Sequence, residues 1–221
     1  MEISRLLPMM WEGLLETLYM TLVSTACAYI IGIPVGVILF VTDKGQIAEC
    51  NIVNKILGFI VNFLRSVPFI ILLIAILPFT RLVVGTTLGS SATIVPLVVA
   101  AAPFVARMVE SSLKEVNSGV IEAALSMGSN NWQIIRKVLL PEAKPSLVVG
   151  STIAITTILG YSAMSGFVGG GGLGAIVINY GYYRYQEDIM VITVIILVIL
   201  VQIFQEAGMR SEEHTSELQS R

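Results

Sequence analysis

Two stretches of the chain have residue types and spacings that perform chemistry in other proteins: a glycine run at residues 166–176 and a polar segment at residues 122–141. The glycine run, GFVGGGGLGAI, contains the spacing G-x-G-x-x-G at Gly169, Gly171 and Gly174. In dinucleotide-binding proteins this spacing cradles a pyrophosphate, but only where a strand precedes it and a helix follows within a βαβ unit. Here it follows an apolar membrane segment. We therefore interpret it as a flexible or tightly packed turn on the outer side of a membrane.

The rest of the chain offers little catalytic chemistry. It has no G-x-x-x-x-G-K-[ST] phosphate loop and no H-E-x-x-H zinc motif, and its one histidine, His214, lies among its last residues. We find no pair of carboxylates placed for acid–base catalysis. The sequence predicts a non-catalytic protein with no metal and no cofactor. Any movement driven by ATP must then come from a partner.

The polar segment, EAALSMGSNNWQIIRKVLLP, predicts two short helices joined by a turn. Gly128 is placed to end the first helix with a positive φ, and Asn130 or Asn131 is placed to cap the second. Pro141 limits the extension of the second helix. The first helix has an apolar edge of Ile121, Ala124 and Leu125. The second has an expected apolar face of Trp132, Ile135, Val138 and Leu139.

A helix-turn-helix of this kind binds DNA in some proteins, but the charges here do not favour it. Phosphate contacts need several basic residues, and Arg136 and Lys137 are set against Glu122 and Glu142. With a net charge of −2 on the whole chain, we expect no nucleic-acid partner. A passive surface loop is the other alternative.

A longer pattern runs through the same segment: E-A-A, three residues, G, nine residues, an aliphatic residue, one residue, and L-P. Here the chain resembles the permease subunits of ABC importers, whose EAA loop docks into a cleft of the ATP-hydrolysing partner. The residues that meet the pattern, and that the resemblance implies in ATPase coupling, are Glu122, Ala123, Ala124, Gly128, Val138, Leu140 and Pro141. The aliphatic position is Val138 rather than the commoner isoleucine, which keeps its packing role.

The parts of the chain on both sides of the polar segment at residues 122–141 are apolar. Hydrophobic residues make up 55% of the 221 residues and charged residues 13%, and the mean hydropathy is +0.85, so we predict an all-α integral membrane protein in contact with lipid. About 20 apolar residues of helix cross a bilayer. On this basis we expect five transmembrane helices at about 17–41, 56–79, 88–109, 146–168 and 187–207. The coupling loop, at about 110–145, joins the third to the fourth.

The orientation follows from the lysines and arginines in the loops. One side has six, namely Lys44, Lys55, Lys114, Arg136, Lys137 and Lys144. The other side has three, namely Arg5, Arg81 and Arg184. This asymmetry predicts that the coupling loop and the C-terminus are cytoplasmic and that the N-terminus is outside.

Further stretches narrow the resemblance to the methionine-importer permeases. They are GYSAMSG at 160–166, GGGGLG, NYGYYRY, RSVPFIILL at 65–73 and APFVARMVE at 102–110, so that the likeness covers nearly everything up to about residue 207. It implies a bacterial inner-membrane homodimer with its path on the two-fold axis, a pair of ABC ATPase subunits inside and an extracytoplasmic methionine-binding protein outside. Tyr161, Ser162 and Met164 lie where a bundle-lining helix would run, with core packing as the alternative to a role in the translocation path. We predict that Met164 is a gate residue, because its flexible thioether can close an apolar constriction and still yield.

Two arginines lie close to or within spans. We expect Arg65 and Arg107 to be paired or to reach the cytoplasmic interface rather than to contact substrate. Glu110 lies three residues after Arg107, a pairing distance on a helix.

Outside the importer class, the alternative function is an ion-coupled secondary transporter of small polar solutes. It would more naturally show inverted repeats and acidic residues near the midplane, which we do not detect. The last residues, RSEEHTSELQSR, resemble a translated sequencing adapter. We therefore expect one permease domain at residues 1–209 and an artefactual tail at 210–221.

Overall fold

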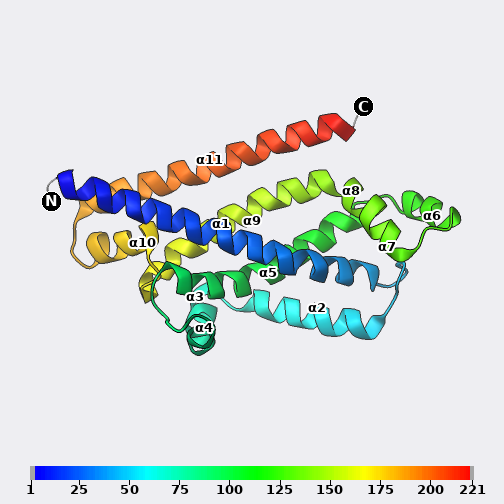
Figure 1. Cartoon of the computed structure of the whole chain (residues 1–221), viewed down its shortest axis with the longest axis horizontal. Helices are drawn as coiled ribbons and strands as arrows, with labels where there is room; N and C mark the ends of the chain where they lie inside the picture. The colour runs from blue at the N-terminus through cyan, green and yellow to red at the C-terminus, as the bar shows by residue number, and fades with distance from the viewer. Residues whose placement is uncertain (1–2, 220–221) are drawn as a thin grey trace.

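The computed structural model describes residues 3–219, without the side chains of residues 3–5, 212 and 214–219. The side chains of Arg5 and His214, and residues 220 and 221 of the expected tail, thus lie outside the described part. The described residues form helices and turns, with no strand among them, which confirms the predicted all-α class. Figure 1 shows the long helices running along one axis, with short helices at both ends.

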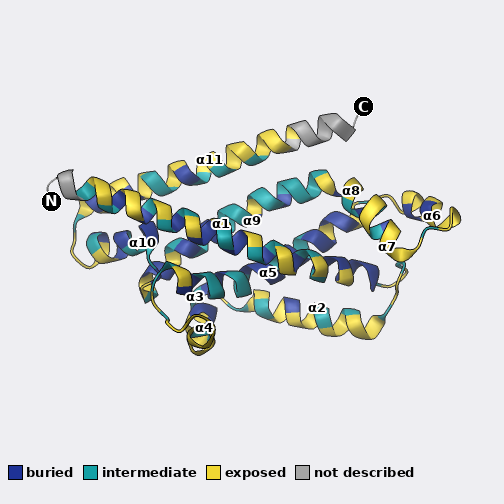
Figure 2. Ribbon diagram, viewed as in Figure 1, coloured by how far each residue is buried: buried dark blue, intermediate teal, exposed yellow. Residues whose placement is uncertain are grey.

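The bundle is built from α1 (Ile3–Val41), α5 (Ser90–Lys114), α9 (Lys144–Met164) and α11 (Glu187–Gln219). Four of the helical runs in the described part are long and apolar enough to cross a membrane, and a bent pair, α2 (Asn51–Ser66) with α3 (Phe69–Ala75), brings the number up to five. This agrees with the five expected spans in number and place. Most of α11 is exposed on the single chain (Figure 2).

The second expected span, 56–79, was wrong as one continuous helix. The chain bends by 103° between α2 and α3. Val67, at the bend, is extended with ψ 125°, as expected for a residue before proline, and Pro68 lacks the N–H that would continue the helix. A further short helix, α4 (Leu77–Val84), follows at the lower edge of Figure 1 and contacts α5.

The two ends of the bundle carry different short elements. At one end α5 is joined to α9 through α6 (Ser118–Ser126), α7 (Asn131–Ile134), the π-helical segment η1 (Ile135–Leu139) and α8 (Leu140–Glu142). At the other end α9 leads through a 3-10 turn, η2 (Ser165–Val168), into α10 (Gly172–Ile176) and the π-helical segment η3 (Val177–Tyr182). The described start of α1 lies at this second end, opposite α6 (Figure 1). We call residues 118–142 the coupling unit.

Helices α1 and α5 approach each other closely at two glycines of α1. A Cβ at Gly36 would lie 2.5 Å from the carbonyl oxygen of Ala106 and 2.7 Å from Cβ of Val109. A Cβ at Gly32 would lie 2.7 Å from Cβ of Val105. Small residues bring membrane helices into backbone contact because lipid provides no hydrophobic force to hold them together.

This packing predicts that substitution by alanine affects stability differently at two glycines. Gly36→Ala should lower the free energy of unfolding by about 1–3 kcal/mol, the usual effect of overpacking, because α1 and α5 must separate. Gly160→Ala is the matched control, since a Cβ at Gly160 would meet nothing within 4 Å, and it should leave stability unchanged or slightly raised. Thermal unfolding of the purified variants in detergent measures both. Equal effects would contradict this account of the α1–α5 contact.

Candidate functional site

The coupling unit begins as the sequence predicts. Helix α6 ends in a left-handed turn at Gly128, whose φ is +78°. Asn130 caps the next helix: its side chain accepts the N–H of Gln133, and the Gln133 side chain accepts the N–H of Asn130, each at 2.9 Å. Of the two asparagines considered for this cap, the structure selects the first. The reciprocal pair fixes the start of the second helix.

The buried face of the second helix agrees with the expected one at Leu139 and differs from it at Trp132 and Ile134. Ile134 and Leu139 are fully buried, whereas Trp132 is 67% exposed; Ile135 and Val138 are half-buried. The expectation assumed an α-helix throughout, but residues 135–139 are π-helical, and residues five apart lie above one another in i→i+5 geometry. Ile134 and Leu139 have this separation. On α6, Ile121 and Ala124 are buried as expected, but Leu125 is 47% exposed.

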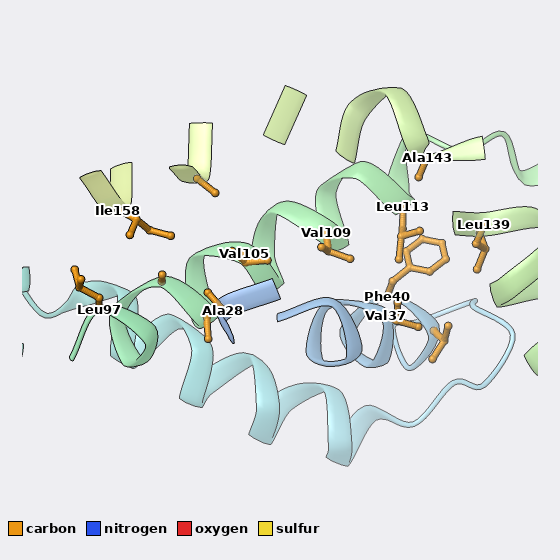
Figure 3. Packing of buried hydrophobic residues seen from close by; sticks show 14 of the residues in the cluster. Ala28, Val37, Phe40, Leu97, Val105, Val109, Leu113, Leu139, Ala143 and Ile158 are labelled. Atoms are coloured by element: carbon orange, nitrogen blue, oxygen red, sulfur yellow. The ribbon is translucent and has the colours of Figure 1, made fainter. Parts of the chain in front are cut away.

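The buried residues of the coupling unit are continuous with the core of the bundle. Val105, Val109 and Leu113 line one side of α5 and are each 0% exposed. They form one cluster with Leu139 and Ala143 at the end of the coupling unit, and with Phe40 at the end of α1 (Figure 3). Because packed interiors deform little, a displacement of the coupling unit is passed to α1 and α5 as well as to α9.

The seven residues of the EAA pattern take two roles in the single chain. Ala124 is buried, and Val138 and Leu140 are half-buried against the core cluster. The exposed members are Glu122, Ala123, Gly128 and Pro141. The pattern thus combines residues that hold the unit to the bundle with residues that face outward.

Large apolar side chains also face outward on the coupling unit. Met127 is 80% exposed and Trp132 67%, beside Leu125 and Val120. Such residues on a polar segment mark a surface that another protein covers. Sequence reasoning missed Met127 and assigned Trp132 to the buried face, because helical periodicity alone does not show where a helix changes from α to π.

A chain of charged and amide groups joins α2, α5 and the loop after α1. Arg107 Nη1 lies 2.5 Å from Glu110 Oε2, which confirms the expected pairing, and Arg107 Nε donates to Asn62 Oδ1 of α2 at 3.1 Å. Lys114 Nζ lies 2.9 Å from Glu110 Oε1 and 3.0 Å from Asp43 Oδ2. The hydrogen bond from Lys114, with a second from the N–H of Lys44, holds the pKa of Asp43 below its ordinary value. Asp43 therefore stays ionised at neutral pH and keeps its ion pair with Lys114.

A second contact holds the same loop to the coupling unit. The Asn131 side chain donates to the carbonyl oxygen of Ile47 at 3.2 Å. A cavity of about 300 Å³ lies between the loop and α6, with Gln46, Lys114 and Glu122 among its lining residues. The loop at residues 42–50, between α1 and α2, is thus a structural neighbour of the coupling unit, which the sequence did not indicate.

The three residues predicted for the translocation path lie at the end of α9 in different surroundings. Met164 is 48% exposed. Tyr161 is stacked on Phe69 of α3, with ring centroids 4.5 Å apart. Ser162 is 1% exposed and donates to the carbonyl oxygen of Leu159 at 2.7 Å, an environment typical of packing inside the subunit. The three residues lie on one helix, but of them only Met164 is exposed on the single chain, with about half of its surface accessible.

The other early candidates are also placed. The glycine run is tightly packed between helices, which decides between the two interpretations of it, and within the described residues no strand precedes it as a dinucleotide site would require. Arg65 is exposed at the end of α2, next to the bend.

The comparisons with known proteins agree with one another. Residues 32–207 match the family described as "Binding-protein-dependent transport system inner membrane component". The chain is 52% identical over 193 residues to "Probable D-methionine transport system permease protein MetI" of Vibrio cholerae, covering 87% of this chain and 86% of that one. It is 54% identical over 162 residues to "D-methionine transport system permease protein MetI" of Escherichia coli, covering 72% and 75%. A solved structure described as "Inward facing conformations of the MetNI methionine ABC transporter" has a TM-score of 0.95 and 49% identity, covering 97% of this chain and 99% of that one.

The network of charged groups around Glu110, at the cytoplasmic end of α5, predicts a loss of stability when Glu110 is removed. Glu110→Ala leaves Arg107 and Lys114 without their shared carboxylate. We expect the free energy of unfolding to fall by about 1.5–3 kcal/mol, the range for hydrogen bonds to charged groups, and the Tm to fall by about 3–10 °C. Glu115→Ala removes an exposed carboxylate five residues later and should change little. Thermal unfolding in detergent compares the two, and a Glu110→Ala protein as stable as the Glu115→Ala protein would contradict the role of this network.

Proposed function

Because the chain belongs to the family of binding-protein-dependent transport system inner membrane components, we propose that it is the membrane-spanning subunit of an ATP-driven importer of methionine. The observation that carries this proposal is the coupling unit, whose buried face is part of the bundle core and whose opposite face is exposed. Relatives more than half identical over most of the chain are named for D-methionine transport, which supports the choice of substrate.

In this mechanism the chain hydrolyses no ATP. Two separate ATPase subunits bind the coupling units of two copies of the chain on the cytoplasmic side. A methionine-binding protein delivers substrate on the other side, near α10. When ATP brings the ATPases together, the coupling units move, and the continuous core passes the movement to the helices around the path. The excess of lysine and arginine near the coupling unit supports its cytoplasmic placement. We assign this permease unit to residues 1–209 and no part of the function to residues 210–221.

Uptake by reconstituted vesicles tests this function. The chain should co-purify with an ATP-binding subunit. With the methionine-binding protein on the opposite side of the membrane, the complex should accumulate labelled methionine only when ATP is supplied on the side of the ATPase. An ionophore should not abolish the uptake. Uptake that survives ATP depletion but stops when the ion gradient collapses would instead support the secondary transporter of small polar solutes.

We assign the ATPase-binding surface to the exposed residues of the EAA pattern, Glu122, Ala123, Gly128 and Pro141, together with Met127 and Trp132. Buried tryptophans contribute more than most residues to protein interfaces, where their truncation costs about 2 kcal/mol or more. Trp132→Ala should therefore weaken binding of the ATPase subunit roughly 30-fold. Ile203→Ala on α11 is the control, since Ile203 is 59% exposed but far along the chain from this surface. Affinity measured with the immobilised ATPase subunit decides the matter, and equal affinities for the two variants would remove Trp132 from the interface.

We assign the gate of the translocation path to Met164, with Tyr161 and Ser162 beside it on α9. Met164→Ala removes a flexible side chain that fills an apolar constriction. It should raise ATP-independent leak of labelled methionine, the resting ATPase rate, or both, by a few-fold or more. The corresponding change at Met209, which is 52% exposed on α11, should alter neither. If Met164→Ala behaves like Met209→Ala in both assays, Met164 is not the gate.

A further inference from the structure

The glycine run at residues 169–172 is held by side chains of α1 that lie about 156 positions earlier in the chain. The N–H of Gly172 donates to Oε2 of Glu16 at 2.6 Å. The N–H of Leu173 donates to Oγ1 of Thr17 at 2.9 Å. Thr17 is 1% exposed and Glu16 is half-buried. Glu16 directly precedes the first expected span, 17–41, and the sequence indicated no role for it.

The approach of the two segments depends on glycine. Gly171 and Gly172 have φ of +85° and +70°, a region that other residues adopt with strain. A Cβ at Gly171 would lie 2.8 Å from Oε2 of Glu16, and a Cβ at Gly172 would lie 2.6 Å from Oγ1 of Thr17. The backbone of the run therefore lies directly on the two acceptors, with no room for a side chain between them.

The run is also bound on its other side. The hydroxyl of Thr93 on α5 donates to the carbonyl oxygen of Gly170 at 3.2 Å, and the N–H of Gly89 donates to that of Gly169 at 2.9 Å. Of these side-chain partners of the run, Glu16 carries the only charge. Hydrogen bonds to a charged acceptor are roughly twice as strong as neutral ones.

Helix α10, which starts at Gly172, packs on the end of α9 without intervening side chains. A Cβ at Gly174 would lie 2.7 Å from the Cα of Ala163, and a Cβ at Gly166 would lie 2.6 Å from the N of Ala175. Ala163 is the residue before Met164. The position of α10 therefore limits where the backbone that carries Met164 can lie.

We propose that Glu16 is a positioning residue that holds α10 against residues 163–166, and so keeps the Met164 side chain in its resting position until the bundle moves. Glu16 contacts neither substrate nor Met164; it acts through the N–H of Gly172 and the backbone contact between α10 and α9. The part of this proposal that concerns transport rests on the proposed function. The part that concerns the hold on α10 does not.

Hydrogen exchange tests the hold directly, on the full chain in complex with its ATPase in lipid nanodiscs. In Glu16→Ala, amides in residues 169–176 should exchange on the order of tenfold faster or more, because a charge-assisted acceptor is lost. Glu16→Gln should restore most of the protection, since its amide oxygen accepts the same N–H. Glu12→Ala is the matched control: Glu12 is exposed one helical turn earlier on α1 and should exchange like the wild type.

Leak in the same variants tests the consequence for the gate. Glu16→Ala should raise ATP-independent leak of labelled methionine several-fold, with rescue by Glu16→Gln, a rescue that general destabilisation of α1 would not produce. Should Glu16→Ala fail to fold, Thr17→Val replaces it, because it removes the neighbouring acceptor at nearly constant shape and should show both effects more weakly.

The outcomes distinguish the hold of Glu16 on α10 from the effect of that hold on Met164. Unchanged exchange in Glu16→Ala and Thr17→Val would overturn the proposal altogether. Faster exchange without any rise in leak would overturn the connection to Met164. A wild-type complex that protects residues 169–176 but takes up no methionine would count against the proposed function, while the exchange data would still support the hold of Glu16 on α10.

Discussion

The packing of the cytoplasmic half of α5 against both α1 and the coupling unit is the interaction on which the rest of the structure depends. Val105, Val109 and Leu113 are fully buried along α5 and join the bundle interior to the short helices outside it. Without this continuity the coupling unit would be an independent surface loop. Its displacement would then be absorbed by the segments that connect it to α5 and α9. Since a close-packed interior transmits strain, one apolar cluster is sufficient to connect a partner at one end to helices around a path.

Polar contacts join separate segments at the two ends of the bundle. At the cytoplasmic end the charged network centred on Glu110 joins α5 to α2 and to the loop after α1. At the other end Glu16 accepts the N–H of Gly172 and joins α1 to α10. Glu16 accepts a donor from another element, whereas Glu110 pairs with two cations of its own helix, which in turn contact α2 and the loop after α1.

The departures from sequence expectation have a common cause. The break at Pro68, the π-helical segment at residues 135–139 and the exposed Trp132 all lie where one helix changes its direction or its turn. Periodicity assumes a constant number of residues per turn, so it assigns the wrong face beyond such a change. A proline in the sequence allows either a break or a helix that continues, and α5 continues through Pro96 and Pro103. Which of these occurs depends on the neighbours that can satisfy the freed carbonyl groups.

What the sequence by itself determined was local. Composition and the length of the apolar runs predicted the membrane helices. Gly128 predicted the turn of the coupling unit, and the two asparagines after it predicted a cap at Asn130 or Asn131. The three-residue spacing predicted the pair of Arg107 and Glu110. Each of these depends on residues within one or two helical turns. The tertiary structure decided the 103° bend after α2, the burial of Ile134, the exposure of Trp132, and the contact of Glu16 with Gly172. These depend on which segments meet across the bundle, a choice made by the free energy of packing the whole chain and not by any short stretch of it.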